Sequence, residues 1–170
     1  MPRTSPARAL AATLLTCALL TGLAGCGDDD GGPRHVGTVL DKTDAEGRHL
    51  RQIPGKDAPD VGLVVQPDPG PDGGWDIRIR VRNFRLSPRG TEARAVHGRG
   101  YVQLYLDGRR LTLLRAVDYR LPGDRVTRGT HKVTARLYAD DRTVWAVEGE
   151  PVEATADLTA SGAETASPSP

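Results

Sequence analysis

Apolar and charged residues alternate one by one from Trp75 to Arg82, and this period of two constrains the fold more than any other feature. Tryptophan, isoleucine and valine occupy the odd positions, and an aspartate and three arginines occupy the even ones. Successive side chains of a strand point to opposite faces, so a strand gathers the apolar groups on one face. A helix spreads the same charges around its surface. The segment is therefore predicted to be a β-strand with one face in a core.

Short runs of the same kind recur along the chain with turn residues between them. They span residues 62–66, 101–106, 111–114, 132–138, 144–147 and 152–156. Asp107-Gly108 is a strong hairpin signal, and Pro122-Gly123, Gly129 and Gly149 mark further breaks. Seven or eight short strands, with turns about every 8 to 12 residues, are typical of an antiparallel β-sandwich. We predict an all-β sandwich domain over residues 61–159.

The first 26 residues have the features of an export signal. A basic start precedes an apolar run from Ala9 to Leu20, which is shorter than the roughly 20 apolar residues of a transmembrane helix. The segment ends in Leu23-Ala24-Gly25-Cys26, which resembles the lipobox of bacterial lipoproteins. That resemblance implies acylation of the Cys26 sulfur with a diacylglyceryl group and cleavage before it. The protein is then expected at the cell membrane, lipid-anchored on its extracytoplasmic face.

The segments on either side of the predicted sandwich are polar and rich in turn residues. Residues 27–60 begin with Gly-Asp-Asp-Asp-Gly-Gly-Pro and contain few apolar residues, so we expect a flexible tether or a loosely docked edge segment. Residues 160–170 are rich in serine, alanine and proline and are predicted to be a disordered tail. Cys17 leaves with the signal, so the mature domain is predicted to lack disulfides.

The charge balance excludes a strongly basic or acidic surface. Without the signal and its two arginines, 21 basic residues face 22 acidic residues. Nucleic acid is therefore not an expected partner.

The segment from Trp75 to Ala154 resembles an uncharacterised family of bacterial exported β-sandwich domains that are immunoglobulin-like in outline. The matching pieces are the Trp75 strand ending in Asn83-Phe84, the hairpin 100–108, the closing residues 137–142, and 149–152. In the family the hairpin typically reads Gly-His-x-His-Leu-Tyr-x-Asp-Gly and a later strand ends in Asn-Asp-His, which implies a metal site. Here Tyr101 and Gln103 replace the two histidines and Asp141 replaces the last one. With His131, these three residues are our candidate site for a polar ligand, without a bound metal or other cofactor.

Other side chains suggest competing hypotheses. His97 and His131 with Asp140 or Asp141 are a possible cation site, and the two aspartates alone suit Ca²⁺. Separately solvated histidines and an ordinary turn at the aspartates are the simpler interpretation. Ser87 stands in a Ser-Pro turn and no Gly-x-Ser-x-Gly occurs, so a catalytic serine is not predicted. Paired carboxylates for a wall-modifying hydrolase are available among Asp118, Asp140, Asp141, Glu148 and Glu150.

The arginine stripe and the aromatic residues each allow two interpretations. Arg78, Arg80 and Arg82 are suited either to anionic wall polymer or phospholipid headgroups, or to a solvated face paired with acids such as Glu153. Trp75 and Trp145 are predicted to pack in the core. Tyr101, Tyr105 and Tyr138 are predicted to be core or partial core, and their exposure would instead suit carbohydrate.

These observations favour a non-catalytic role. We predict a lipoprotein that acts as a binding or structural interaction module of the cell envelope, with the lipid bilayer, reached through Cys26, as one partner. A cell-wall polymer or an envelope protein is the other expected partner. The alternative functions are a metal-handling module for copper or a divalent cation and, less favoured, the hydrolase.

Overall fold

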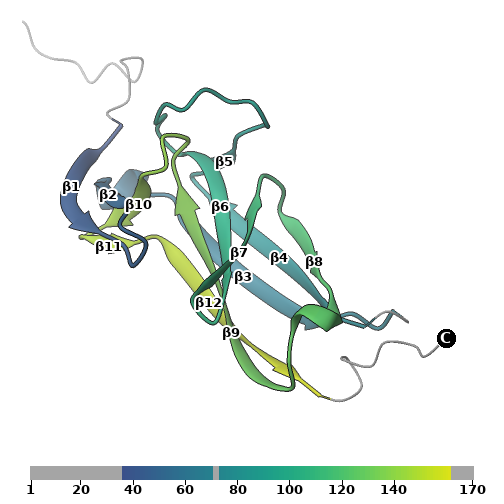
Figure 1. The fold of residues 1–170 in the computed structure, drawn as a ribbon. Helices are drawn as coiled ribbons and strands as arrows, with labels where there is room; N and C mark the ends of the chain where they lie inside the picture. The colour runs from purple at the N-terminus through teal and green to yellow at the C-terminus, as the bar shows by residue number, and fades with distance from the viewer. Residues whose placement is uncertain (1–35, 71–72, 162–170) are drawn as a thin grey trace, which may run out of the picture. The chain divides into compact units, whose positions relative to one another are not determined.

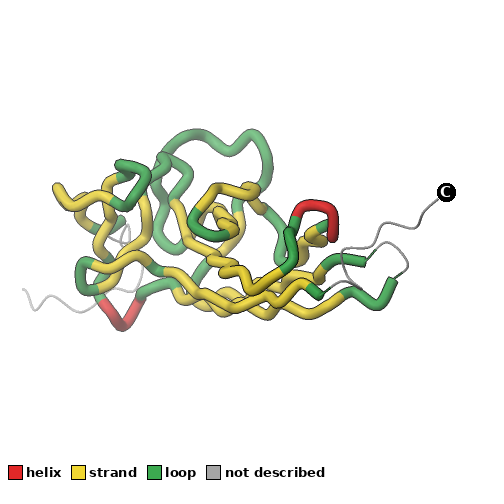
Figure 2. The backbone as a smooth tube through the Cα atoms, turned by 60° about the horizontal axis from the view of Figure 1, so that its bottom comes forward, coloured by secondary structure: helices red, strands yellow, loops and turns green. Residues whose placement is uncertain are grey.

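The structure is a computed structural model and describes residues 36–70 and 73–161. Within these residues the chain forms twelve strands and two short 3-10 helices, η1 (Gly55–Asp57) and η2 (Gly123–Arg125). Figure 2 shows that strands make up most of the traced backbone. None of the described residues belongs to a helix that could span a lipid bilayer. The strands form two sheets, which confirms the predicted all-β sandwich, but the expected number of seven or eight strands was too low.

The smaller sheet has three strands in the order β3 (Asp60–Pro67), β4 (Trp75–Arg82) and β8 (Asp118–Leu121). The predicted alternation along β4 is confirmed, because Trp75, Ile77 and Ile79 are buried while the three arginines are exposed. Arg78 pairs with Asp118 on β8, and Arg82 pairs with Asp60 on β3. The outer arginines of the stripe therefore make the cross-strand ion pairs that were expected, although not with Glu153.

The larger sheet follows the order β1-β2-β10-β9-β6-β5, with β7, β11 and β12 pairing alongside (Figure 1). The strands are β1 (Thr38–Thr43), β2 (His49–Gln52), β5 (Arg85–Leu86), β6 (Arg99–Leu106), β7 (Arg109–Leu114), β9 (Gly129–Tyr138), β10 (Val144–Val147), β11 (Glu150–Pro151) and β12 (Glu153–Ala160). The sandwich is not purely antiparallel, because β2 pairs with β10 and β5 pairs with β6 in parallel. Parallel pairing joins segments far apart in the sequence, so short-range turn signals give no indication of it.

The main core lies between the two sheets. It combines the inner face of β4 with the inner faces of β6 and β9, and Trp145 of β10 is completely buried within it. The inward residues of the larger sheet are Val102, Leu104, Val133, Ala135 and Leu137. Both tryptophans therefore belong to the core, as predicted. Their large apolar area contributes on the order of 25 cal/mol per Å² removed from water.

The turn between β6 and β7 is the hairpin predicted at Asp107-Gly108. Both residues have positive φ, 50° and 76°, and Leu106 faces Arg109 across a two-residue loop. These values are typical of a type I′ turn, whose twist matches that of the strands it joins. Asp107 also accepts a hydrogen bond from the Lys132 N–H at 2.8 Å, so the turn is fastened to β9.

The segment before the predicted sandwich differs from the expected arm. From Val36 onward it contains β1 and β2, and β2 is placed between β1 and β10. Leu50 and Ile53 have no exposed surface, and the Ile53 N–H donates to the Ala146 carbonyl at 2.9 Å. The apolar residues here are few, but they are buried, so the domain begins before residue 61.

β12 ends at Ala160, which is buried. The predicted tail boundary was therefore one residue too early. The signal segment 1–26, its lipobox, residues 27–35 and the tail from 162 onward lie outside the described residues.

Candidate functional site

Tyr101 and Gln103 lie side by side on the outer face of β6, two residues apart. The Tyr101 ring stacks on the Tyr138 ring with centroids 5.4 Å apart, and the Arg115 guanidinium lies 5.4 Å from the Tyr101 centroid. The Gln103 side-chain nitrogen donates to the Thr112 carbonyl at 2.7 Å and to the Leu104 carbonyl at 3.1 Å. Both side chains are buried, so this pair is engaged within the protein.

His131 and Asp141 lie elsewhere, with partners of their own. The two ring nitrogens of His131 lie 2.6 Å from Asp107 Oδ2 and 2.9 Å from the Thr127 carbonyl oxygen. Asp141 accepts from Arg51 Nη2 at 2.7 Å and from the Thr143 hydroxyl at 2.7 Å. No hydrogen bond or ring contact among the described residues joins any two of the four candidates. They therefore do not form one site in this structure.

The residues considered for a cation site are likewise separated. Asp140 and Asp141 are neighbours in sequence, but Asp140 bonds to Ser87 while Asp141 bonds to Arg51. Across residues 36–70 and 73–161, no group of three histidine, cysteine, aspartate or glutamate side chains is arranged to hold a metal ion. Of the carboxylates considered for hydrolysis, Asp118 pairs with Arg78 and Glu150 with Lys42.

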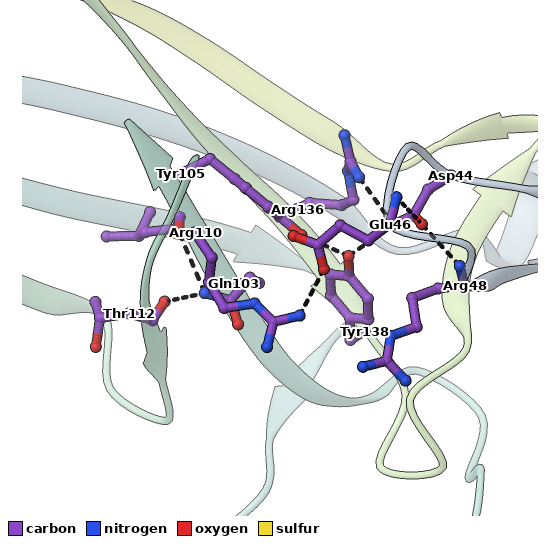
Figure 3. A network of polar contacts seen from close by, with 10 residues as sticks. Asp44, Glu46, Arg48, Gln103, Tyr105, Arg110, Thr112, Arg136 and Tyr138 are labelled. Atoms are coloured by element: carbon purple, nitrogen blue, oxygen red, sulfur yellow. Dashed lines mark hydrogen bonds and ion pairs between the residues drawn. The ribbon is translucent and has the colours of Figure 1, made fainter. Parts of the chain in front are cut away.

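A polar network that includes Asp44, Tyr105, Arg136 and Tyr138 covers the outer face of β6 and β9 (Figure 3). Its centre is Asp44, in the turn between β1 and β2, whose side chain has no exposed surface. Asp44 Oδ2 accepts from the Tyr138 hydroxyl at 2.8 Å and from Arg136 Nη1 at 2.9 Å. The Tyr105 and Tyr138 hydroxyl oxygens are 2.6 Å apart. Tyr138 is thus bonded to the β1–β2 turn, and all three tyrosines are buried, as the predicted core or partial core requires.

The same aspartate orders its own turn. Asp44 Oδ1 accepts from the backbone N–H groups of Glu46 at 2.9 Å and Arg48 at 2.8 Å. Burial by itself raises the pKa of the Asp44 carboxyl, but these N–H donors, the Tyr138 hydroxyl and Arg136 together lower it below its usual value. Burial and the hydrogen bonds with Tyr105 and Asp44 raise the pKa of Tyr138. The network therefore keeps the Asp44 carboxylate ionised and the Tyr138 phenol protonated. In these states the two groups stabilise the fold.

Asp140 is the centre of a second buried cluster that sequence analysis missed. Its carboxylate, 1% exposed, accepts from the Ser87 hydroxyl at 2.5 Å and from Arg115 Nη1 at 3.2 Å. Arg115 Nη1 also donates to the Ser87 carbonyl at 2.9 Å. Ser87, the residue of the predicted Ser-Pro turn, is 1% exposed and comes shortly before the turn residues 89–90. Its hydroxyl fastens the long connection between β5 and β6 to the end of β9.

Next to this cluster lies a cationic cavity of about 510 Å³. Its wall is formed by the residues between β4 and β5 with the first residue of β5, by the residues that lead into β6 with its first residue, and by η1. The lining residues are Lys56, Asn83, Phe84, Arg85, Val96, His97, Gly98 and Arg99. None of these lining residues is acidic, and only His97 was considered from the sequence, as part of a possible cation site with His131. The one available signal was that these stretches are rich in basic residues, and it could not show that they meet.

His131 makes the stability of the domain depend on pH. The hydrogen bond to Asp107, with that to the Thr127 carbonyl, raises the pKa of His131 above 6.5. A raised pKa means that protonated His131 stabilises the folded state, fully below about pH 6.5, and that this contribution disappears as pH rises through the folded-state pKa. Chemical denaturation from pH 5.5 to 8.5 should therefore show wild type losing about 0.5 kcal/mol relative to His131→Gln. A constant difference between the two across this range contradicts the assignment.

Comparison with known proteins finds no match: no family model, no curated protein and no solved structure is similar to this chain. The resemblance of its hairpin to a family of exported domains therefore stays an expectation.

Proposed function

We propose that this chain is a lipoprotein anchored through Cys26 on the extracytoplasmic face of the cell membrane, and that its sandwich is a binding module of the cell envelope. The observation that carries the proposal is the sequence Leu23-Ala24-Gly25-Cys26 at the end of an export signal. A diacylglyceryl group supplies two acyl chains, and each buried CH₂ contributes about 0.8 kcal/mol. Two chains meet the requirement for stable anchoring.

The described residues support binding in preference to catalysis. The side chains that most resemble catalytic groups are used to hold the fold, since the Ser87 hydroxyl and the Asp140 carboxylate are buried against each other. The cationic cavity, in contrast, presents charged side chains around an open volume. A concave surface with few, convergent polar groups is typical of a binding site.

The test of the anchor compares two cysteine variants of the full-length chain in a bacterial host. Cys26→Ser removes the acylated sulfur, and Cys17→Ser is the matched control within the same signal. We expect wild type and Cys17→Ser to incorporate a labelled fatty acid and to give a mature mass that begins at residue 26. Cys26→Ser should incorporate none. An unlabelled wild-type chain that retains its first methionine would overturn the proposal.

A further inference from the structure

The cationic cavity is formed by segments that only the fold brings together. Asn83 and Gly98 both have positive φ, 51° and 58°, and a Cβ on Gly98 would lie 2.6 Å from the Asn83 carbonyl oxygen. The Arg85 N–H donates to the Gly98 carbonyl at 2.8 Å, and Asn83 Nδ2 donates to the Ala58 carbonyl at 3.1 Å. Hydrogen bonds within the chain therefore shape the wall before any ligand arrives.

Among the residues that the structure describes, the cavity wall contains basic side chains and no acidic one. Arg85 and Arg99 are direct register partners in the parallel pair of β5 and β6. Like charges at opposite positions destabilise a sheet. Lys56 and His97 line the same volume. Within the part of the chain that the structure describes, Arg85 has no carboxylate within ion-pair distance. A bound anion would relieve this repulsion.

Arg99 is held in place by the buried Asp140 cluster. Its Nε donates to the Ser87 hydroxyl oxygen at 3.1 Å and lies 4.0 Å from Asp140 Oδ2. Its backbone carbonyl accepts from the Trp145 indole at 3.2 Å. Among the described residues the terminal guanidinium nitrogens make no hydrogen bond, and the side chain is 36% exposed. The Arg99 side chain is thus held in the cavity wall by its Nε, and its Nη1 and Nη2 atoms are available to bind a ligand.

We propose that the cavity binds a phosphate group, with Arg85 and Arg99 as its main ligands and Lys56 as a further cation. The planar guanidinium group matches the oxygens of phosphate through paired hydrogen bonds, and two neighbouring arginines favour a group that carries more than one charged oxygen. Both an anionic phospholipid headgroup and a free phosphate compound carry this chemistry. The inference deepens the proposed function, on which it rests for the choice between these two sources.

The experiment is calorimetric titration of the full chain, purified in a neutral detergent, with soluble probes. Inorganic phosphate represents the free compound, and glycerophosphoglycerol, which has no acyl chains, represents the lipid headgroup. Acetate is the anion control. We expect saturable binding of at least one phosphate probe, weakened by salt, and no saturable binding of acetate. Preference between the two phosphate probes identifies the source.

Arg85→Gln is the test variant because Arg85 lines the cavity and is not part of the Asp140 cluster. Arg89→Gln is the matched control, since Arg89 is an exposed arginine four residues further along that does not line the cavity. We expect Arg85→Gln to weaken phosphate binding about tenfold or more, as the loss of charged hydrogen bonds predicts. Arg89→Gln should bind like wild type. Thermal unfolding of each variant shows whether it is folded.

Three results would overturn the inference: no binding of either phosphate probe, equal binding of acetate, or equal weakening by the two variants. The proposed anchor and the proposed phosphate site can be disproved independently. Cys26→Ser leaves the cavity unchanged and Arg85→Gln leaves the lipobox unchanged, so loss of fatty-acid labelling and loss of phosphate binding are independent readouts.

Discussion

Asp44→Ala is expected to lower the free energy of unfolding by about 3 kcal/mol, which is a large part of the stability of a small domain. The substitution removes four hydrogen-bond acceptor contacts at once: two from backbone N–H groups of its turn, one from Tyr138 and one from Arg136. Arg136 keeps its second partner, Glu153, at 2.7 Å, so its charge stays paired. The expected decrease in the free energy of unfolding is therefore smaller than the maximum of about 5 kcal/mol for breaking a buried ion pair. Denaturant unfolding measures it.

Asp41→Ala is the matched control, because Asp41 is an exposed aspartate on β1 close to the same turn. It should change stability by less than about 0.5 kcal/mol. The folded-state pKa of Asp44 is lowered, so its contribution is complete above the unfolded-state pKa of about 3.9 and is lost as pH falls through the folded-state value. The wild-type advantage over Asp44→Asn should accordingly be constant from pH 7 to 5 and decline below pH 4. Equal stability of Asp44→Ala and wild type would mean that the β1–β2 turn is not docked.

Gly100→Ala is expected to destabilise the domain by about 3 kcal/mol or more, enough to prevent folding of a marginal chain. Gly100 is part of β6 with φ of 152°, and a Cβ built there collides with the Tyr138 carbonyl oxygen. Tyr138 ends β9, whose register with β6 begins at the Tyr101 pair. The clash therefore lies between β6 and β9 in the larger sheet, where backbone atoms cannot move aside without breaking hydrogen bonds.

Gly55→Ala supplies the comparison for this prediction. Gly55 is in η1, its backbone is not left-handed, and an added Cβ meets no atom within 4 Å. Circular dichroism during thermal unfolding should show a wild-type melting temperature for Gly55→Ala and a large decrease, or no folded signal, for Gly100→Ala. A melting temperature of Gly100→Ala within a few degrees of wild type would contradict the close approach of β6 and β9.

The prediction of the candidate site from sequence was partial for a physical reason. Tyr101 and Gln103 do lie on one face of β6, because side-chain direction in a strand depends only on position along it and the two residues are two positions apart. His131 was grouped with them, but it bonds to Asp107 in the β6–β7 turn. Which groups meet in space depends on register between strands, and residue types alone do not specify it.

Elements with a local signal were predictable from the sequence. The alternation along β4, the Asp107-Gly108 turn and the burial of both tryptophans follow from neighbouring residues, because period and turn chemistry act over a few positions. The three-dimensional structure was needed to show that the β1–β2 turn bonds to Tyr138 of β9 and that Arg85 and Arg99 line one cavity. These arrangements depend on the pairing of segments distant along the chain. Such pairing is set by the packing of the whole domain, so no local pattern encodes it.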